Sequence, residues 1–193
     1  MGGKGGDMKI KEIVLTALNL LGRADVARAM ESGETLSAEA ESVADTVLYC
    51  VNAVLDELAR YYFPLTNRES FCLTSGRVAF ADFSARPVKL LRVTANGREI
   101  KYETAPRYLI ADEGKIEVEY EYSPSKKPMD GDCDYDGVEV GARLVAAGAA
   151  SEFCILNGEA VAAEYWEGEY RREIDRARAK FKKPLKIPPR RWV

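Results

Sequence analysis

The sequence predicts an α+β protein: a four-helix bundle with an antiparallel β module inserted between helices two and three, followed by an extended C-terminal arm. Three observations indicate this class. Apolar residues recur every three or four positions up to residue 66 and again after residue 137, which is typical of amphipathic helices. Between these stretches apolar and polar residues alternate, which is typical of half-buried strands. Three of the last twelve residues are proline, which cannot continue a helix.

The size and composition fit one globular domain with a small inserted module. The chain has 193 residues, of which 47% are hydrophobic and 31% are charged. The expected organisation is a flexible glycine-rich start (1–7), a helical bundle (8–66 and 138–181), an inserted β module with an acidic loop (67–137) and a docking arm (182–193).

Two helices are expected before the β module. The first follows the apolar residues from Ile10 to Leu21 and stops at Gly22. After a polar link, Ser37 is a good N-cap for a second, longer helix, which Pro64 ends. Glu39 and Glu41 fall in its first turn, where the helix dipole favours acids.

Two further helices are expected after the β module. The stretch from Val140 to Leu156 is rich in alanine and apolar nearly all round, so it is expected at the centre of the bundle. Asn157-Gly158 breaks it, and the last helix runs from about Glu159 to Phe181.

The β module is expected to hold five or six short antiparallel strands. Asn96-Gly97 predicts a hairpin turn, because both central positions of a type I′ turn need positive φ. Residues 115–122 predict the clearest strand, with one face apolar and the other charged. The apolar face holds Ile116, Val118, Tyr120 and Tyr122.

The composition argues against most kinds of catalytic and metal chemistry. There is no histidine, which excludes Ser-His-Asp and Cys-His catalysis and every histidine-ligated metal. The four cysteines form no CxxC motif and are expected as reduced thiols. No apolar stretch is long enough for a membrane span, and no cofactor motif is present. An enzyme with a carboxylate site stays open as a third interpretation.

One acidic motif has a candidate ligand pattern. Asp132, Asp134, Asp136 and Gly137 match the first six positions of a calcium-binding loop. The pattern fails at position twelve, where Arg143 replaces the bidentate glutamate. The favoured interpretation is an acidic loop that caps a helix beginning near Val138, and divalent-ion binding is the alternative.

The charge of the chain is strongly asymmetric. Residues 171–193 contain ten lysines and arginines and two acids, a net charge of +8, so residues 1–170 carry −11. In the arm, basic residues are interleaved with apolar anchors, a pattern typical of docking segments. A solvated tail and a nucleic-acid contact are the alternatives. The candidate docking residues are Phe181, Lys182, Lys183, Leu185, Lys186, Ile187, Arg190, Arg191 and Trp192.

The order of parts resembles the head-to-tail adaptor (connector) proteins of tailed bacteriophages, of the tail-tubular-A type. Three features bear the resemblance from about residue 9 onward. The second helix ends LDELARYYFPL (55–65). The β module reads VKLLRVTANGREIKYE (88–103) and GKIEVEYEYSPSKKP (114–128) and runs into the acidic loop. An alanine-rich helix is followed by EAVAAEYWEGEYRREIDRARAKF (159–181) and an arm ending PPRRW (188–192).

The resemblance implies a structural virion protein rather than an enzyme. Such adaptors form a ring, commonly of twelve subunits, under the portal, where they extend the DNA channel and present the tail attachment surface. The resemblance implies portal binding by the candidate docking residues and contact with a downstream tail or nozzle protein. It also implies manufacture in the bacterial cytoplasm and a final place in the virion neck, with no membrane. An acidic body would let DNA pass without specific binding. A nucleic-acid-binding module that uses the basic last helix and arm is the second interpretation.

Overall fold

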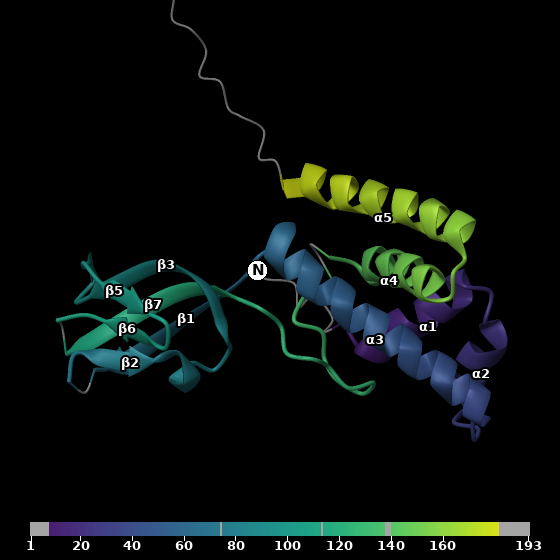
Figure 1. The fold of residues 1–193 in the computed structure, drawn as a ribbon, viewed down its shortest axis with the longest axis horizontal. Helices are drawn as coiled ribbons and strands as arrows, with labels where there is room; N and C mark the ends of the chain where they lie inside the picture. Colours follow the sequence, from purple (N-terminus) through teal and green to yellow (C-terminus); the bar gives the residue numbers. More distant parts are fainter. Residues whose placement is uncertain (1–7, 74, 113, 138–139, 182–193) are drawn as a thin grey trace, which may run out of the picture.

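The fold is α+β, with a helical part beside a β part (Figure 1). The computed structural model describes residues 8–73, 75–112, 114–137 and 140–181. Three helices precede the strands and two follow them. The helices are α1 (Ile10–Leu20), α2 (Ala24–Ser32), α3 (Ala38–Tyr61), α4 (Ala142–Leu156) and α5 (Ala160–Phe181).

The β part consists of two antiparallel sheets. One has the strand order β1-β7-β3-β4 and the other β2-β6-β5. The strands are β1 (Leu65–Cys72), β2 (Arg77–Ala79), β3 (Pro87–Ala95), β4 (Arg98–Glu99), β5 (Glu103–Ala105), β6 (Tyr108–Ile110) and β7 (Lys115–Tyr122), with a 3₁₀ turn at Phe80–Asp82.

The prediction of a four-helix bundle with the β module after the second helix is wrong. The described chain contains five helices, and the β part follows the third of them. The additional helix, α2, lies in the expected polar link. It has only nine residues and buries only Val26 and Ala27, so its apolar periodicity is too short to stand out. Gly33 ends it in the left-handed conformation. The described β part also has seven strands rather than the expected five or six, and they form two antiparallel sheets.

The long helix α3 begins where its cap was predicted. The Ser37 hydroxyl accepts a hydrogen bond from the Ala40 amide at 3.2 Å, and Glu39 and Glu41 lie in the first turn. Its apolar stripe is buried against α1 and α4. Helix α3 ends at Tyr61, because Pro64 has no amide hydrogen with which to continue the helical hydrogen bonds.

Helix α4 is the centre of the helical part and contacts α1, α3 and α5. Its buried residues are mostly small, four of them alanine, which lets neighbouring backbones approach closely. At Gly148 there is no room for a side chain: a Cβ atom would lie 2.9 Å from both Tyr170 Cε2 of α5 and Val54 Cγ1 of α3. Helices α3, α4 and α5 therefore pack closely around Gly148, where only a glycine fits.

The β part has a core of its own. In β7, Ile116, Val118 and Tyr120 are buried, which confirms the predicted alternation. The predicted Asn96-Gly97 turn is also confirmed: φ is 52° and 75° at these residues, and the turn joins β3 to β4. The buried members of this core are Val78, Phe83, Val93, Ala95, Leu109, Ile116, Val118 and Tyr120.

The side chain of Glu69, in β1, lies at the edge of this core. The Tyr120 hydroxyl donates to the Glu69 carboxylate, which also accepts from the hydroxyl and the amide of Ser84 at 2.8 and 3.2 Å. Burial raises the pKa of Glu69, but these hydrogen bonds outweigh it and hold the pKa below its ordinary value. An inward carboxylate also protects β1, an edge strand, against pairing with other chains.

Replacing Gly148 by alanine should destabilise the protein by about 1–3 kcal/mol, because the added methyl group overlaps Tyr170 and Val54. Urea unfolding measures the change. Gly168 of α5 is the matched control: a Cβ atom added there would have no neighbouring atom within 4 Å, so G168A should stabilise by up to about 1 kcal/mol. Equal effects of the two substitutions would contradict the packing described for α4.

Replacing Tyr120 by phenylalanine should cost about 1–3 kcal/mol at pH 7, since Glu69 loses a buried donor. The folded-state pKa of Glu69 is lowered, so its stabilising contribution is present above the pKa of the unfolded chain. That contribution is lost as the pH falls through the folded-state pKa. The difference between wild type and Y120F should therefore shrink in urea titrations below about pH 4. Y102F, at an exposed tyrosine, should show neither effect.

Candidate functional site

The end of α5 is fastened to the end of α3, next to the β part. Tyr170, Ile174 and Ala177 of α5 are buried in the helical core. Near the last turn, the Arg178 guanidinium lies 4.9 Å from the centre of the Tyr62 ring and donates to the Tyr61 carbonyl at 3.4 Å. The position from which the C-terminal segment continues is thus fixed by contacts to α3 (Figure 1).

Only the first of the candidate docking residues belongs to the described chain. Phe181 is the last residue of α5. The other candidates lie outside the described residues: Lys182, Lys183, Leu185, Lys186, Ile187, Arg190, Arg191 and Trp192.

The acidic loop is fastened to the helical part by ion pairs. Asp132 pairs with Lys9, and Asp134 pairs with Lys127 at 2.8 Å. In the described chain, no group of three acidic or cysteine side chains is placed to hold a metal ion. The loop does not cap the following helix as expected. That helix, α4, begins at Ala142 rather than near Val138, and its N-cap is Gly141, which has no side chain to offer.

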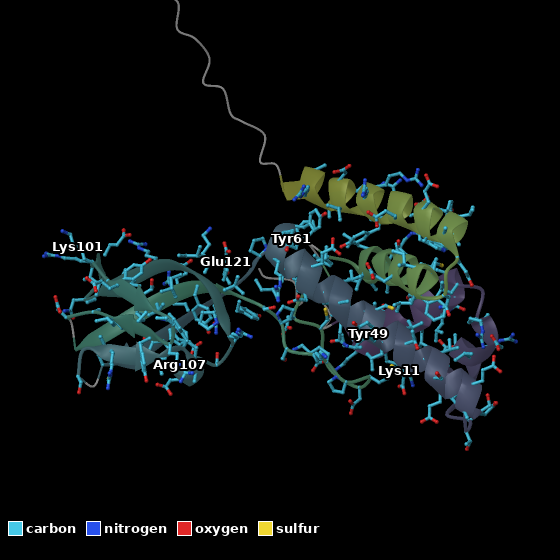
Figure 2. The ribbon with its side chains drawn as sticks, in the orientation of Figure 1. Lys11, Tyr49, Tyr61, Lys101, Arg107 and Glu121 are labelled. Atoms are coloured by element: carbon cyan, nitrogen blue, oxygen red, sulfur yellow. The ribbon has the colours of Figure 1, made fainter. Side chains whose placement is uncertain are left out.

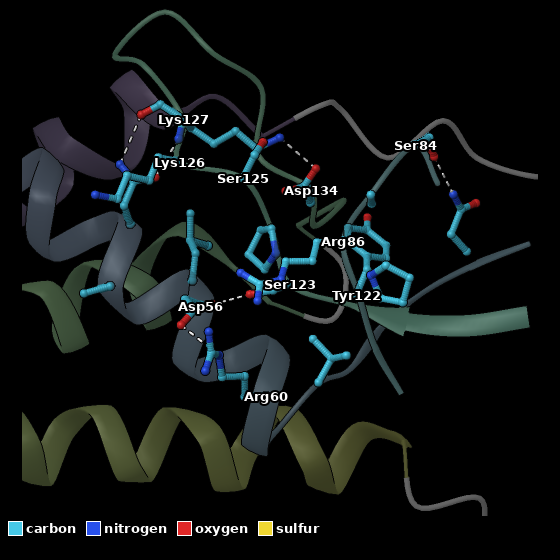
Figure 3. Close-up of a pocket in the computed structure, with 18 of the residues that line it drawn as sticks. Asp56, Arg60, Ser84, Arg86, Tyr122, Ser123, Ser125, Lys126, Lys127 and Asp134 are labelled. Carbon is cyan, nitrogen blue, oxygen red and sulfur yellow. Dashed lines mark hydrogen bonds and ion pairs between the residues drawn. The ribbon is translucent and has the colours of Figure 1, made fainter. Parts of the chain in front are cut away.

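A large groove of about 1340 Å³ separates α3 from the β part (Figure 3). One wall is the exposed face of α3, including Tyr49, and the other comes from residues 84–88 and 122–127. Figure 2 shows Tyr49 on the outside of the helical part, and 60% of its surface is exposed. The groove is thus the boundary between the two parts of the molecule.

Hydrogen bonds link the two walls of this groove. The Asn52 side-chain amide donates to the Lys127 carbonyl at 3.1 Å and accepts from the Lys127 amide at 2.6 Å. Ser123 donates to Asp56, which also pairs with Arg60 at 2.9 Å. Together these bonds fasten the chain that leaves β7 to the side of α3 (Figure 3).

A second surface lies at the turn between α4 and α5. Ile155, Leu156, Val161 and Tyr165 are exposed there by 57–85% of their surface, and we call these four residues the hairpin patch. Beside them is a shallow hollow of about 630 Å³, lined by residues 159–162, Tyr165 and Trp166. The rings of Tyr165 and Trp166 meet edge to face with their centres 5.0 Å apart; Tyr165 is exposed and Trp166 is half-buried.

The negative charge is concentrated on the helical part. Residues 8–66 and 123–170 together carry 19 acids and eight basic residues, whereas residues 67–122 carry nine of each. The acidity predicted for residues 1–170 therefore belongs to the helices and the acidic loop. The chain therefore combines an acidic helical surface with a basic C-terminal segment.

The buried thiols are not activated. Burial, together with the nearby Glu152 carboxylate, raises the pKa of Cys50 to about 11. Burial also raises the pKa of Cys133 and of Cys154. Reactive thiols need the opposite shift, toward a thiolate at neutral pH.

The comparisons with known proteins assign no family. No protein-family model matches the sequence, and no curated protein matches it significantly. None of the described helices offers the length of apolar sequence that a bilayer crossing requires.

Replacing Asn52 by alanine should weaken the attachment of residues 123–127 to α3. The Lys127 carbonyl and the Lys127 amide would each lose their hydrogen bond to the Asn52 side chain. We expect a loss of about 1–3 kcal/mol in urea unfolding and faster deuterium exchange at residues 124–127. Asn19→Ala, at an exposed position of α1, is the control and should change neither quantity. Unchanged exchange at residues 124–127 in N52A would show that the attachment does not depend on Asn52.

Proposed function

We propose that this protein is a head-to-tail adaptor of a tailed bacteriophage, a structural virion protein that forms a ring under the portal, with twelve as the expected number of subunits. One observation supports the proposal most: α5, clamped to α3 at Tyr61 and Tyr62, holds a basic segment at a fixed point of an otherwise acidic molecule. A passive connector needs such a segment to reach its partner, with a rigid origin and complementary charge. The portal is the proposed partner of residues 181–192, and a downstream tail or nozzle protein binds the opposite side.

The charge distribution supports the same function. A ring through which DNA passes must not hold the duplex, and an acidic helical surface repels phosphates. Residues 8–66 and 123–170 supply this surface, since their acids outnumber their basic residues by more than two to one. In this proposal DNA moves through the lumen without specific binding.

The ion pairs of α5 argue against the alternative of a nucleic-acid-binding helix. Arg171 pairs with Glu167 and Arg176 with Glu173, both at 2.7 Å, and Arg172 pairs with Glu169. These arginines are therefore neutralised by acids of the same helix. Within residues 171–193, phosphate contacts would then rest mainly on the C-terminal segment.

The test is co-assembly with the portal protein from the same source, examined by co-sedimentation and negative-stain electron microscopy. Full-length protein should add a ring of density to the portal. Truncation after Phe181 should abolish binding, because it removes five basic residues and Trp192. Deletion of residues 1–7 is the matched control and should leave the ring intact.

A different result would favour nucleic-acid binding. In that case full-length protein does not bind the portal but binds duplex DNA, with an affinity that falls steeply as the salt concentration rises. If the five basic residues of the segment contact phosphates, the slope of log K against log salt should be about −4.5.

A further inference from the structure

We propose that the hairpin patch binds residues 182–193 of a second copy of this chain. This contact lies beyond the adaptor function and does not require it, because it concerns two surfaces of the same protein. The occupant is identified from the apolar character of the patch, the charge around it, and the distance between the patch and the end of α5.

The patch has the character of a contact surface. Four large apolar side chains are exposed within eleven residues of sequence, and Val161 is the most exposed of them at 85%. Adjacent exposed apolar side chains of this size mark interaction sites on soluble proteins. The hollow beside Val161 and Tyr165 gives an apolar side chain of a partner a place to enter.

The chain segment that forms the patch carries only acidic charge. No lysine or arginine occurs between Arg143 and Arg171, whereas five glutamates do. Glu159 and Glu164 border the patch and are exposed, and among the described residues neither forms an ion pair with a basic side chain. A suitable partner therefore combines apolar anchors with positive charge.

The C-terminal segment of the chain has this combination. Residues 182–193 contain five basic residues and no acid. Between them stand Leu185, Ile187 and Trp192, which are of the size that the hollow and the patch accept. Tryptophan and arginine contribute most often to the binding energy of interfaces.

The geometry favours a second copy over the same chain. The patch lies at the start of α5 and the segment continues from its end, and a helix of 22 residues is about 33 Å long. Twelve residues span about 40 Å at full extension, so a segment turning back along its own helix would have little length left for contacts. A neighbouring copy imposes no such limit.

The proposed contact joins two different surfaces and is therefore head-to-tail. Each copy offers one patch and one segment, so association continues until a ring closes or a chain forms. A portal that binds the segment would compete with the patch for it.

The test uses sedimentation velocity of full-length protein over a range of concentrations at low and high salt. Full-length protein should self-associate, and the association should weaken at about 0.5 M salt because screening shortens the range of the charge attraction. Truncation after Phe181 should abolish it. L156S/V161S should weaken it at least about tenfold, a change of about 1.4 kcal/mol, without altering the circular dichroism spectrum or the melting temperature.

A mixing experiment separates the two surfaces. The truncated protein keeps its patch, and L156S/V161S keeps its segment. Mixed, they should form a one-to-one dimer and nothing larger. Tyr49→Ser, at another exposed aromatic residue, is the control and should associate like wild type.

Three results would overturn the inference: full-length protein that stays monomeric, truncated protein that associates like wild type, or a mixture that forms no dimer. A monomer in which L156S/V161S changes the fluorescence of Trp192, measured in a W166F background, would show that the segment binds its own patch. Portal binding is measured separately with L156S/V161S, which keeps the segment. Failure of self-association is thereby distinguishable from failure of the adaptor function.

Discussion

The packing of the helical part depends on the small side chains of α4. Its alanines and Gly148 let α1, α3 and α5 approach to distances that larger side chains would forbid. Tyr170 of α5 fills the space that Gly148 leaves, and α5 then lies along the body as far as Tyr61. The close packing of α5 on α4 therefore depends on the absence of a side chain at Gly148.

The molecule has two hydrophobic cores rather than one. The helices share the larger core, and the two sheets share the smaller. The paired strands β1 and β7 connect the two cores, with Leu65 and Tyr122 as the pair nearest the helices. The connection is reinforced by hydrogen bonds between α3 and the chain after β7: Asn52 bonds to both Lys127 peptide groups, and Asp56 accepts from Ser123. Polar contacts of this kind set the orientation of the β part without merging the cores.

The parts of the fold that sequence could predict have strong local signals. The Ser37 cap, the Asn96-Gly97 turn and the alternation of β7 are each determined by neighbouring residues. Helix α2 was missed because nine residues with two buried side chains give almost no periodicity. The groove and the hairpin patch were missed for another reason: they arise where elements distant in sequence meet or where a helix pair ends, and periodicity does not report exposure there.

The insertion of the β part also has a consequence for synthesis. The helical core needs α4, which begins about 80 residues after α3 ends. At the usual rates of translation, these residues take about 4–16 s to be made. At the end of that time the β part has all of its strands, whereas the apolar stripes of α1 and α3 still have no α4 to cover them. The β part can therefore fold on the ribosome before the helices close, and the nascent chain passes through a stage in which chaperones have an exposed apolar surface to protect.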